Sequence, residues 1–174
     1  MKKIFALTLL AGLLALPGCQ TADTTESIPA VTEFELSKYL GVWYENARLP
    51  HSFERDMMKV QAVYSLRPDG KVQVLNSGVK NGKDKNITGI AKFKGDSSSG
   101  YLRVSFFRPF YGDYKIIYLE PDYSLAIVTS ASKDYLWILS RTKVLSQEKM
   151  DFCLNKIRDW GFDVSKLEYP NVSN

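Results

Sequence analysis

The chain has 174 residues, of which 45% are hydrophobic and 24% are charged, with a formal net charge of +4. This length and apolar content suit one domain with a sizeable core. Lysines and arginines are scattered, with no basic helix and no aromatic RNA-binding motif, so the sequence predicts no nucleic-acid partner.

The first 18 residues have the character of a secretory signal peptide. Lys2 and Lys3 give a positive start, and residues 4–16 are apolar and uncharged but too few to span a membrane. The following "ALPGCQ" resembles the lipobox of bacterial lipoproteins, although Pro17 stands where those proteins usually carry a small or β-branched residue. The resemblance implies acylation of Cys19, and Gln20 after it implies the outer membrane of a Gram-negative bacterium. The alternative is an ordinary secreted protein with a chance cysteine.

Residues 20–33, "QTADTTESIPAVTE", are polar and contain one proline, which predicts a flexible tether. We therefore divide the chain into a signal peptide over residues 1–18, a lipidated tether over 19–33 and one folded domain over 34–174. Each buried methylene of an acyl chain contributes roughly 0.8 kcal/mol to membrane binding, so several chains on Cys19 would anchor the protein permanently.

After a short helical piece at 36–40, the domain alternates between strand-like runs and turns. The runs begin at residues 41, 59, 71, 86, 101, 112, 124 and 135. Asp69-Gly70 and Asn81-Gly82 between them are typical of tight hairpins. Strands at this spacing, joined mostly by hairpin-length loops, predict an antiparallel sandwich or barrel. The final "KLEYP" is a candidate for a last short strand.

The alternation of side chains assigns two faces to each strand. Over 59–107 one face is apolar and mixes very small with aromatic side chains, an arrangement that leaves room for a cavity. Over 112–120 and 135–142 both faces are apolar, so the outer face needs a cover. A helix from Ser146, its N-cap, to Trp160, with Gly161 at its end, is the expected cover.

The sequence offers little catalytic or metal-binding chemistry. His51 is the single histidine, and Cys153 falls on the apolar face of the predicted helix, where a buried inert thiol is expected. These two residues cannot build an ordinary zinc site, and no G-x-S-x-G nucleophile motif is present. We expect no enzyme, no metal and no cofactor.

Three separated motifs resemble those of the lipocalin family. Gly41-Val42-Trp43 resembles the family's G-x-W motif, and Pro121-Asp122-Tyr123 resembles its T-D-Y motif with proline in place of threonine. Arg141, at the end of "LWILSR", resembles the third motif, and a helix follows it. The ordered match spans residues 34–170, and with the lipobox it resembles the bacterial outer-membrane lipocalins in particular.

The resemblance implies an all-β, eight-stranded antiparallel up-and-down barrel, open at one end, with one C-terminal α-helix packed outside. It also implies that five motif residues are structural and close the other end: Gly41, Trp43, Asp122, Tyr123 and Arg141. The guanidinium of Arg141 is expected to lie over the indole of Trp43, a contact that contributes roughly 0.5–2 kcal/mol.

Fatty acids or lysophospholipids are the ligands that the resemblance implies, stored or transported at the outer membrane. Apolar walls with few polar anchors suit such ligands. The alternative is a scaffold lipoprotein with a filled barrel that binds another envelope protein. The lining candidates, for each of which plain core packing is the alternative, are Val60, Ala62, Tyr64, Val74, Asn76, Ala91, Phe93, Val104, Phe106, Tyr114, Ile116, Tyr118, Tyr135 and Trp137.

Polar and aromatic residues near the predicted mouth leave several roles open. Asn76 and the tyrosines can hydrogen-bond a carboxylate or phosphate head, and Glu45 is predicted to be an inward-facing acid that needs a partner. The sequence places three arginines toward the mouth, as ligand anchors or as solvated loop residues: Arg48, Arg55 and Arg108. The aromatic turn at 106–111 suits a hydrophobic lip, a membrane contact or a homodimer surface.

Overall fold

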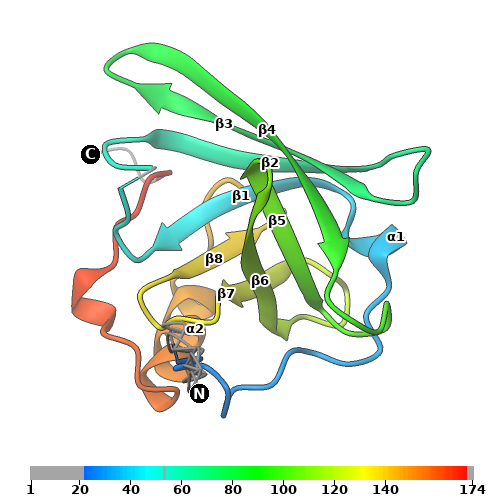
Figure 1. Ribbon diagram of the computed structural model, residues 1–174. Coiled ribbons are helices and arrows are strands. Elements are labelled where there is room, and N and C mark those ends of the chain that lie inside the picture. The colour runs from blue at the N-terminus through cyan, green and yellow to red at the C-terminus, as the bar shows by residue number, and fades with distance from the viewer. Residues whose placement is uncertain (1–21, 53, 172–174) are drawn as a thin grey trace, which may run out of the picture.

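The computed structural model describes residues 22–52 and 54–171. Its eight strands form one closed antiparallel barrel, in which each strand pairs with its sequence neighbours and β8 pairs back onto β1 (Figure 1). This confirms the predicted up-and-down barrel. The strands are β1 (Gly41–Arg48), β2 (Met58–Leu66), β3 (Val72–Lys80), β4 (Lys83–Phe93), β5 (Tyr101–Phe107), β6 (Phe110–Leu119), β7 (Leu125–Thr129) and β8 (Leu136–Ser140).

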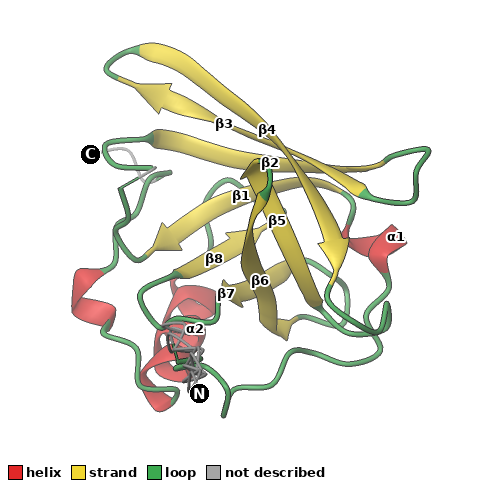
Figure 2. Cartoon of the chain, in the orientation of Figure 1, coloured by secondary structure: helices red, strands yellow, loops and turns green. Residues whose placement is uncertain are grey.

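The helices are α1 (Leu36–Tyr39), α2 (Gln147–Asp159) and the 3₁₀ turn η1 (Val164–Lys166). The Ser146 side chain caps α2 by accepting a hydrogen bond from the Lys149 amide at 3.4 Å. Cys153 and Ile157 of α2 are fully buried against the outer face of β7 and β8, so the helix packs outside the barrel as expected (Figure 2). Among the described helices, none is long and apolar enough to cross a membrane.

The antiparallel order gives the barrel two different ends. The loops at 67–71, 94–100 and 120–124 lie at the end that carries α1, which we call the floor. The loops at 49–57, 81–82, 108–109 and 130–135 lie at the opposite end, the mouth, and together form its rim. Figure 1 shows α1 at the far end of the barrel from the β1–β2 loop.

Residues 22–33 lie on the barrel, which corrects the expectation of a flexible tether for this part of it. The predicted signal peptide, Cys19 and the start of the tether lie outside the described residues. The Thr24 amide donates to the Ala131 carbonyl at 3.0 Å, and the Val31 amide donates to the Ile116 carbonyl at 2.9 Å. Ile28 is buried against the outer core beside α2. Gly100 makes room for Val31, since a Cβ on this glycine would lie 2.6 Å from Val31 Cγ2.

An irregularity in β6 moves Tyr118 to the outside of the barrel. Ile116 pairs with Val128 but Tyr118 pairs with Ile127, so β6 has an extra residue at this point. The Tyr118 ring therefore packs against Phe152 of α2, with ring centroids 5.2 Å apart. The prediction that Tyr118 lines the interior is wrong, because strict alternation holds only where the pairing is uninterrupted.

The C-terminal segment closes a gap between β1 and β2. These strands pair only over 41–44 and 61–64, at the floor side. Toward the mouth, Glu168 forms an isolated bridge with Arg48, and the Asn171 side chain donates to the carbonyls of Glu45 and Val60 at 2.8 and 3.0 Å. The predicted last strand is thus a single bridge, between Glu168 and Arg48, which closes the gap between β1 and β2 (the seam of the barrel).

Candidate ligand-binding site

Arg141 and Trp43 close the floor. The guanidinium carbon of Arg141 lies 4.0 Å from the centroid of the fully buried Trp43 ring. The same guanidinium donates to the Val42 carbonyl at 2.6 Å and to the last carbonyls of α1, which helical hydrogen bonding leaves unsatisfied. Gly41 has a φ of 95°, a conformation that favours glycine, at the point where the chain passes under this arginine.

The second motif joins the same assembly. The Tyr123 hydroxyl accepts a hydrogen bond from the Glu35 amide at 2.8 Å, and the backbone carbonyl of Tyr123 accepts one from Arg141 Nε at 3.2 Å. Asp122 accepts from the Ser124 amide at 3.0 Å, and hydrogen bonds with Ser124 lower the pKa of this carboxyl. These contacts connect α1, the β6–β7 turn and the end of β8 across the floor.

Three tyrosines fill the interior just above the floor. The Tyr114 hydroxyl lies 2.7 Å from that of Tyr39 and 2.8 Å from that of Tyr64. Burial raises the pKa of all three, so they stay neutral at physiological pH. Three hydroxyl hydrogens serve two hydrogen bonds here, which leaves one donor for a further acceptor. Two predicted anchors for a polar head, Tyr64 and Tyr114, therefore lie deep in the barrel.

On β5 and β8, the inward-facing side chains become more exposed from floor to mouth. On β8, Leu139 is 5% exposed, whereas Trp137 is half-buried, as is Tyr135 just before the strand. On β5, Leu102 is 4% exposed, whereas Val104 and Phe106 are half-buried. The inner cluster contains ten of the predicted lining residues, buried or packed against it: Tyr64, Val74, Ala91, Ile116, Ala62, Phe93, Val104, Phe106, Tyr114 and Trp137.

Two further predicted lining residues differ from this pattern. Val60 lies toward the mouth but is only 3% exposed, since it is close to Gly78 and the C-terminal segment. Asn76 lies in the middle of β3, and its Oδ1 atom is buried without a hydrogen-bond partner in the described chain. A buried acceptor in this state costs about 1–3 kcal/mol, so a donor arriving in the barrel would be stabilised there.

Arg48 is a buried structural residue, which corrects both readings of it as a solvated or ligand-anchoring arginine. It is 2% exposed and pairs with Glu45 through Nη1 at 2.7 Å and with Glu168 through Nε at 3.0 Å. An irregularity between Glu45 and Ala47 in the pairing with β8 allows both Glu45 and Arg48 to face inward. Glu45 thus has the partner that its inward position requires. Arg55 and Arg108 are exposed on the rim.

A cluster of His51, Glu54 and Trp137 lies near the mouth and was not predicted. His51 Nε2 lies 2.9 Å from Glu54 Oε2, and the same carboxylate oxygen accepts from Trp137 Nε1 at 3.3 Å. Burial, and then the nearby Glu54, raise the pKa of Glu45 to about 8. The sequence signal for this pair is the His-x-x-Glu spacing, in which a histidine and a glutamate three residues apart can meet on one short turn.

The described residues provide no metal centre, since no three histidine, cysteine or acidic side chains gather in that part of the chain. Cys153 is fully buried, and burial raises the pKa of its thiol to about 12. Such a thiol is a poor nucleophile at neutral pH.

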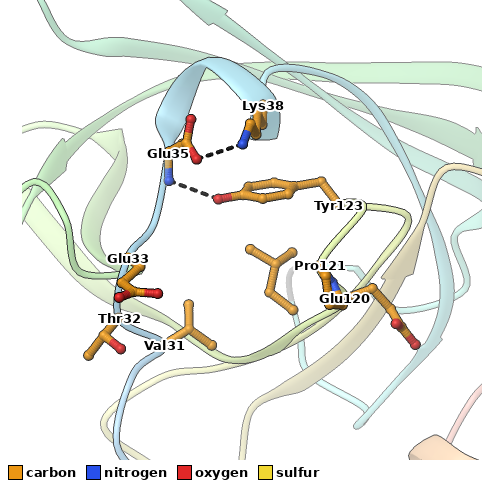
Figure 3. Close-up of a pocket in the computed structure, with 9 residues that line it drawn as sticks. Val31, Thr32, Glu33, Glu35, Lys38, Glu120, Pro121 and Tyr123 are labelled. Carbon is orange, nitrogen blue, oxygen red and sulfur yellow. Dashed lines mark hydrogen bonds and ion pairs between the residues drawn. The ribbon is translucent and has the colours of Figure 1, made fainter.

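Two surface hollows lie outside the barrel. One, of about 240 Å³, lies at the floor end between α1 and the β6–β7 turn, where Glu33, Glu35 and Glu120 line it with Lys38 and Tyr123 (Figure 3). The other, of about 320 Å³, lies between the β7–β8 loop and the segment after α2. Neither is lined by the predicted interior residues, and three acidic side chains make the first unsuited to a fatty acid.

Comparison with known proteins identifies the family. Residues 34–172 match the model of a lipocalin-like domain. The chain is 42% identical to the outer membrane lipoprotein Blc of Vibrio cholerae, over 97% of this chain and 98% of that protein. It is 43% identical to Blc of Escherichia coli K12, over 86% and 85% of the two chains. The expected outer-membrane location agrees with the names of these relatives.

A solved structure supports the fold independently of close sequence similarity. Insecticyanin from the tobacco hornworm Manduca sexta is 24% identical, with a TM-score of 0.69 over 84% of this chain and 85% of that chain. The temperature-induced lipocalin-1 of Arabidopsis thaliana is 36% identical over 82% of this chain. The barrel and its external helix agree with these matches, and the chain belongs to the lipocalin family.

Proposed function

We propose that the barrel binds one fatty acid or lysophospholipid and stores or transports it at the outer membrane, to which acylated Cys19 anchors the protein. The apolar tail lies toward the tyrosines above the floor. The polar head lies toward the mouth, where Arg55 and Arg108 are exposed on the rim.

The observation that carries this proposal is the rise in exposure along the inner faces of β5 and β8. A barrel filled by its own side chains, as in the scaffold alternative, would bury Val104, Phe106 and Trp137 as completely as Leu102 and Leu139. They are half-buried instead. An apolar, accessible interior is what a lipid tail requires, because transfer of its methylenes from water is favourable by roughly 0.8 kcal/mol each.

A pair of adjacent substitutions tests ligand binding. Ala62 faces the interior and joins the inner cluster, whereas Gln61 next to it faces outward. Ala62→Trp should fill the middle of the barrel and weaken palmitate or lysophosphatidylethanolamine binding at least tenfold in a fluorescence titration. Gln61→Trp adds the same side chain outside and should leave affinity unchanged. Equal affinities in the two variants would favour the filled-barrel scaffold.

Acylation is tested separately. Intact mass measurement of the protein from a Gram-negative host should show a chain that begins at Cys19 and carries acyl groups. The Cys19→Ala variant should lose this mass increment and leave the membrane fraction. A wild-type chain without acyl groups would favour the alternative, an ordinary secreted protein in which Cys19 is not modified.

A further inference from the structure

The described chain begins at the mouth of the barrel. The Thr24 amide donates to the Ala131 carbonyl at 3.0 Å, and the Lys133 amide donates to Thr24 Oγ1 at 2.9 Å. Both partners belong to the β7–β8 loop of the rim, and Figure 1 shows this N-terminal start on the side of α2 and away from α1. From here the chain runs along β6 toward the floor, where Val31 meets Ile116.

The covalent reach of the chain then limits how the barrel can sit on a membrane. Cys19 precedes Thr24 by five residues, which span at most about 18 Å even when fully extended. The two strands joined by the loop that holds Thr24, β7 and β8, have only five residues each, so at roughly 3.3 Å per residue and a tilt near 40° Ala131 lies about 15 Å above Leu125 at the floor end of β7. A floor-down orientation would therefore use most of the reach of residues 19–24 in a fully extended form, whereas a mouth-down orientation needs little of it.

The same rim carries the most exposed large apolar side chains of the described residues. Phe107 is 72% exposed and Phe110 is 78% exposed, and the two residues pair directly across the β5–β6 turn. This turn is the neighbour of the β7–β8 loop in the order of the barrel. Arg108 in the turn and the exposed Lys83 and Lys85 of the β3–β4 hairpin add positive charge to the rim.

We propose that the mouth of the anchored barrel faces the bilayer and that Phe107 and Phe110 insert at the boundary between head groups and acyl chains. The inference rests on the proposed acylation of Cys19. Two aromatic side chains bury about 150–250 Å² each, which suits insertion but falls short of the roughly 800 Å² per partner of a stable protein interface. Basic rim residues near an anionic leaflet contribute about 1 kcal/mol each. A ligand then passes between bilayer and barrel without crossing bulk water.

Depth-dependent fluorescence quenching tests this orientation on the full-length acylated protein. A cysteine label at position 110 (Phe110→Cys) is compared with one at position 66 (Leu66→Cys), since Leu66 is 59% exposed at the floor end of β2. The buried Cys153 does not compete for the label. The vesicles contain phosphatidylethanolamine and phosphatidylglycerol at 3:1, with bromine in the acyl chains.

The label at 110 should lose at least half of its fluorescence in these vesicles and the label at 66 almost none. Adding Phe107→Ser should weaken the quenching at 110. Equal quenching at the two sites, or stronger quenching at 66, would overturn the proposal. So would disulfide cross-linking of 110 to 110 in detergent with sedimentation as a dimer, because the turn would then be a contact between two copies.

These results are independent of the proposed lipid ligand. Quenching reports only the position of the rim, whereas the Ala62→Trp titration reports only the interior. Intact mass of the vesicle-bound protein verifies acylation in the same sample. A chain that lacks acyl groups overturns both the anchor and the orientation, whereas an acylated chain without quenching at 110 overturns the orientation alone.

Discussion

Two side chains, Trp43 and Arg141, hold the floor of the barrel together. The indole is fully buried, donates to the Tyr39 carbonyl at 2.7 Å and lies under the guanidinium that binds the end of α1. Its removal leaves a large cavity and takes one donor from the Tyr39 carbonyl. This dependence predicts a stability effect rather than a binding effect.

Trp43→Ala should lower the free energy of unfolding by about 3–5 kcal/mol, as for other buried tryptophans. Urea denaturation measures the change, with Trp137→Ala as the matched control. Trp137 is half-buried on the inner wall near the mouth, so its loss should reduce fatty-acid affinity more than stability. If Trp43→Ala were to retain full stability and lose only ligand binding, the structural role of this motif would be refuted.

Glu45 predicts a pH dependence of stability. Burial and the nearby Glu54 raise its pKa from 4.5 to about 8, so the folded state keeps a proton that the unfolded chain releases. Stability from this group is therefore complete below about pH 4.5 and falls as the pH rises toward 8. The hydrogen bond with Arg48 persists when the acid is neutral, since its carbonyl oxygen still accepts.

Glu45→Gln should flatten the fall in the urea midpoint between pH 5 and pH 8, because the amide does not titrate. Glu168→Gln is the control, since Glu168 pairs with the same Arg48 but its side chain is 42% exposed. The control should keep the wild-type slope. An unchanged slope in Glu45→Gln would mean that this acid does not govern the pH dependence.

Lys115 of β6 holds the N-terminal segment on the barrel by hydrogen-bonding its backbone, as Arg141 holds α1 on the floor. It is 3% exposed, and its ammonium donates to the Thr25 carbonyl and hydroxyl at 2.9 Å each and to the Ile28 carbonyl at 3.3 Å. The segment therefore docks on β6 through a buried charge rather than through apolar contacts alone.

Lys115→Met should increase amide hydrogen exchange over residues 22–33 and lower stability by about 1–3 kcal/mol, because the buried acceptors lose their donor. Lys92→Met is the control, since Lys92 is exposed and its ammonium lies 4.7 Å from the centroid of the Tyr111 ring, away from the N-terminal segment. Exchange mass spectrometry compares the variants. Wild-type protection of 22–33 in Lys115→Met would show that the segment is held by other contacts.

The elements that sequence predicted well are those governed by local pattern. Alternation predicted the strands, and a capped apolar stripe predicted α2, whereas the choice of a closed barrel over a sandwich came from the family resemblance. Tyr118 was assigned to the wrong face, and Arg48 was not predicted to be buried, because each follows a pairing irregularity and alternation carries no sign of the extra residue. The docking of residues 22–33 depends on Gly100 and Lys115, which lie far away in sequence, so a polar composition alone suggested a tether.

In the whole molecule, the two ends of the described chain complete the barrel, because the strands alone leave β6 uncovered and a gap between β1 and β2. The N-terminal segment covers β6, and residues 168–171 fill the seam where β1 and β2 separate toward the mouth. The floor is held by motif residues from three regions, so the mouth depends more on these terminal contacts. The floor is thus closed by the motif residues, whereas the gap between β1 and β2 near the mouth is closed by residues 168–171.

A chain that ends at Leu167 tests this closure. It loses the Glu168 bridge to Arg48 and both hydrogen bonds of Asn171, and should lose about 3 kcal/mol of stability in total. Hydrogen exchange should quicken first in the mouth-side halves of β1 and β2, where the seam opens. The matched control ends at Asn171 and keeps every one of these contacts, so it should unfold like the full chain. Equal stability of the two truncations would mean that the β1–β2 pairing near the floor is sufficient to close the barrel.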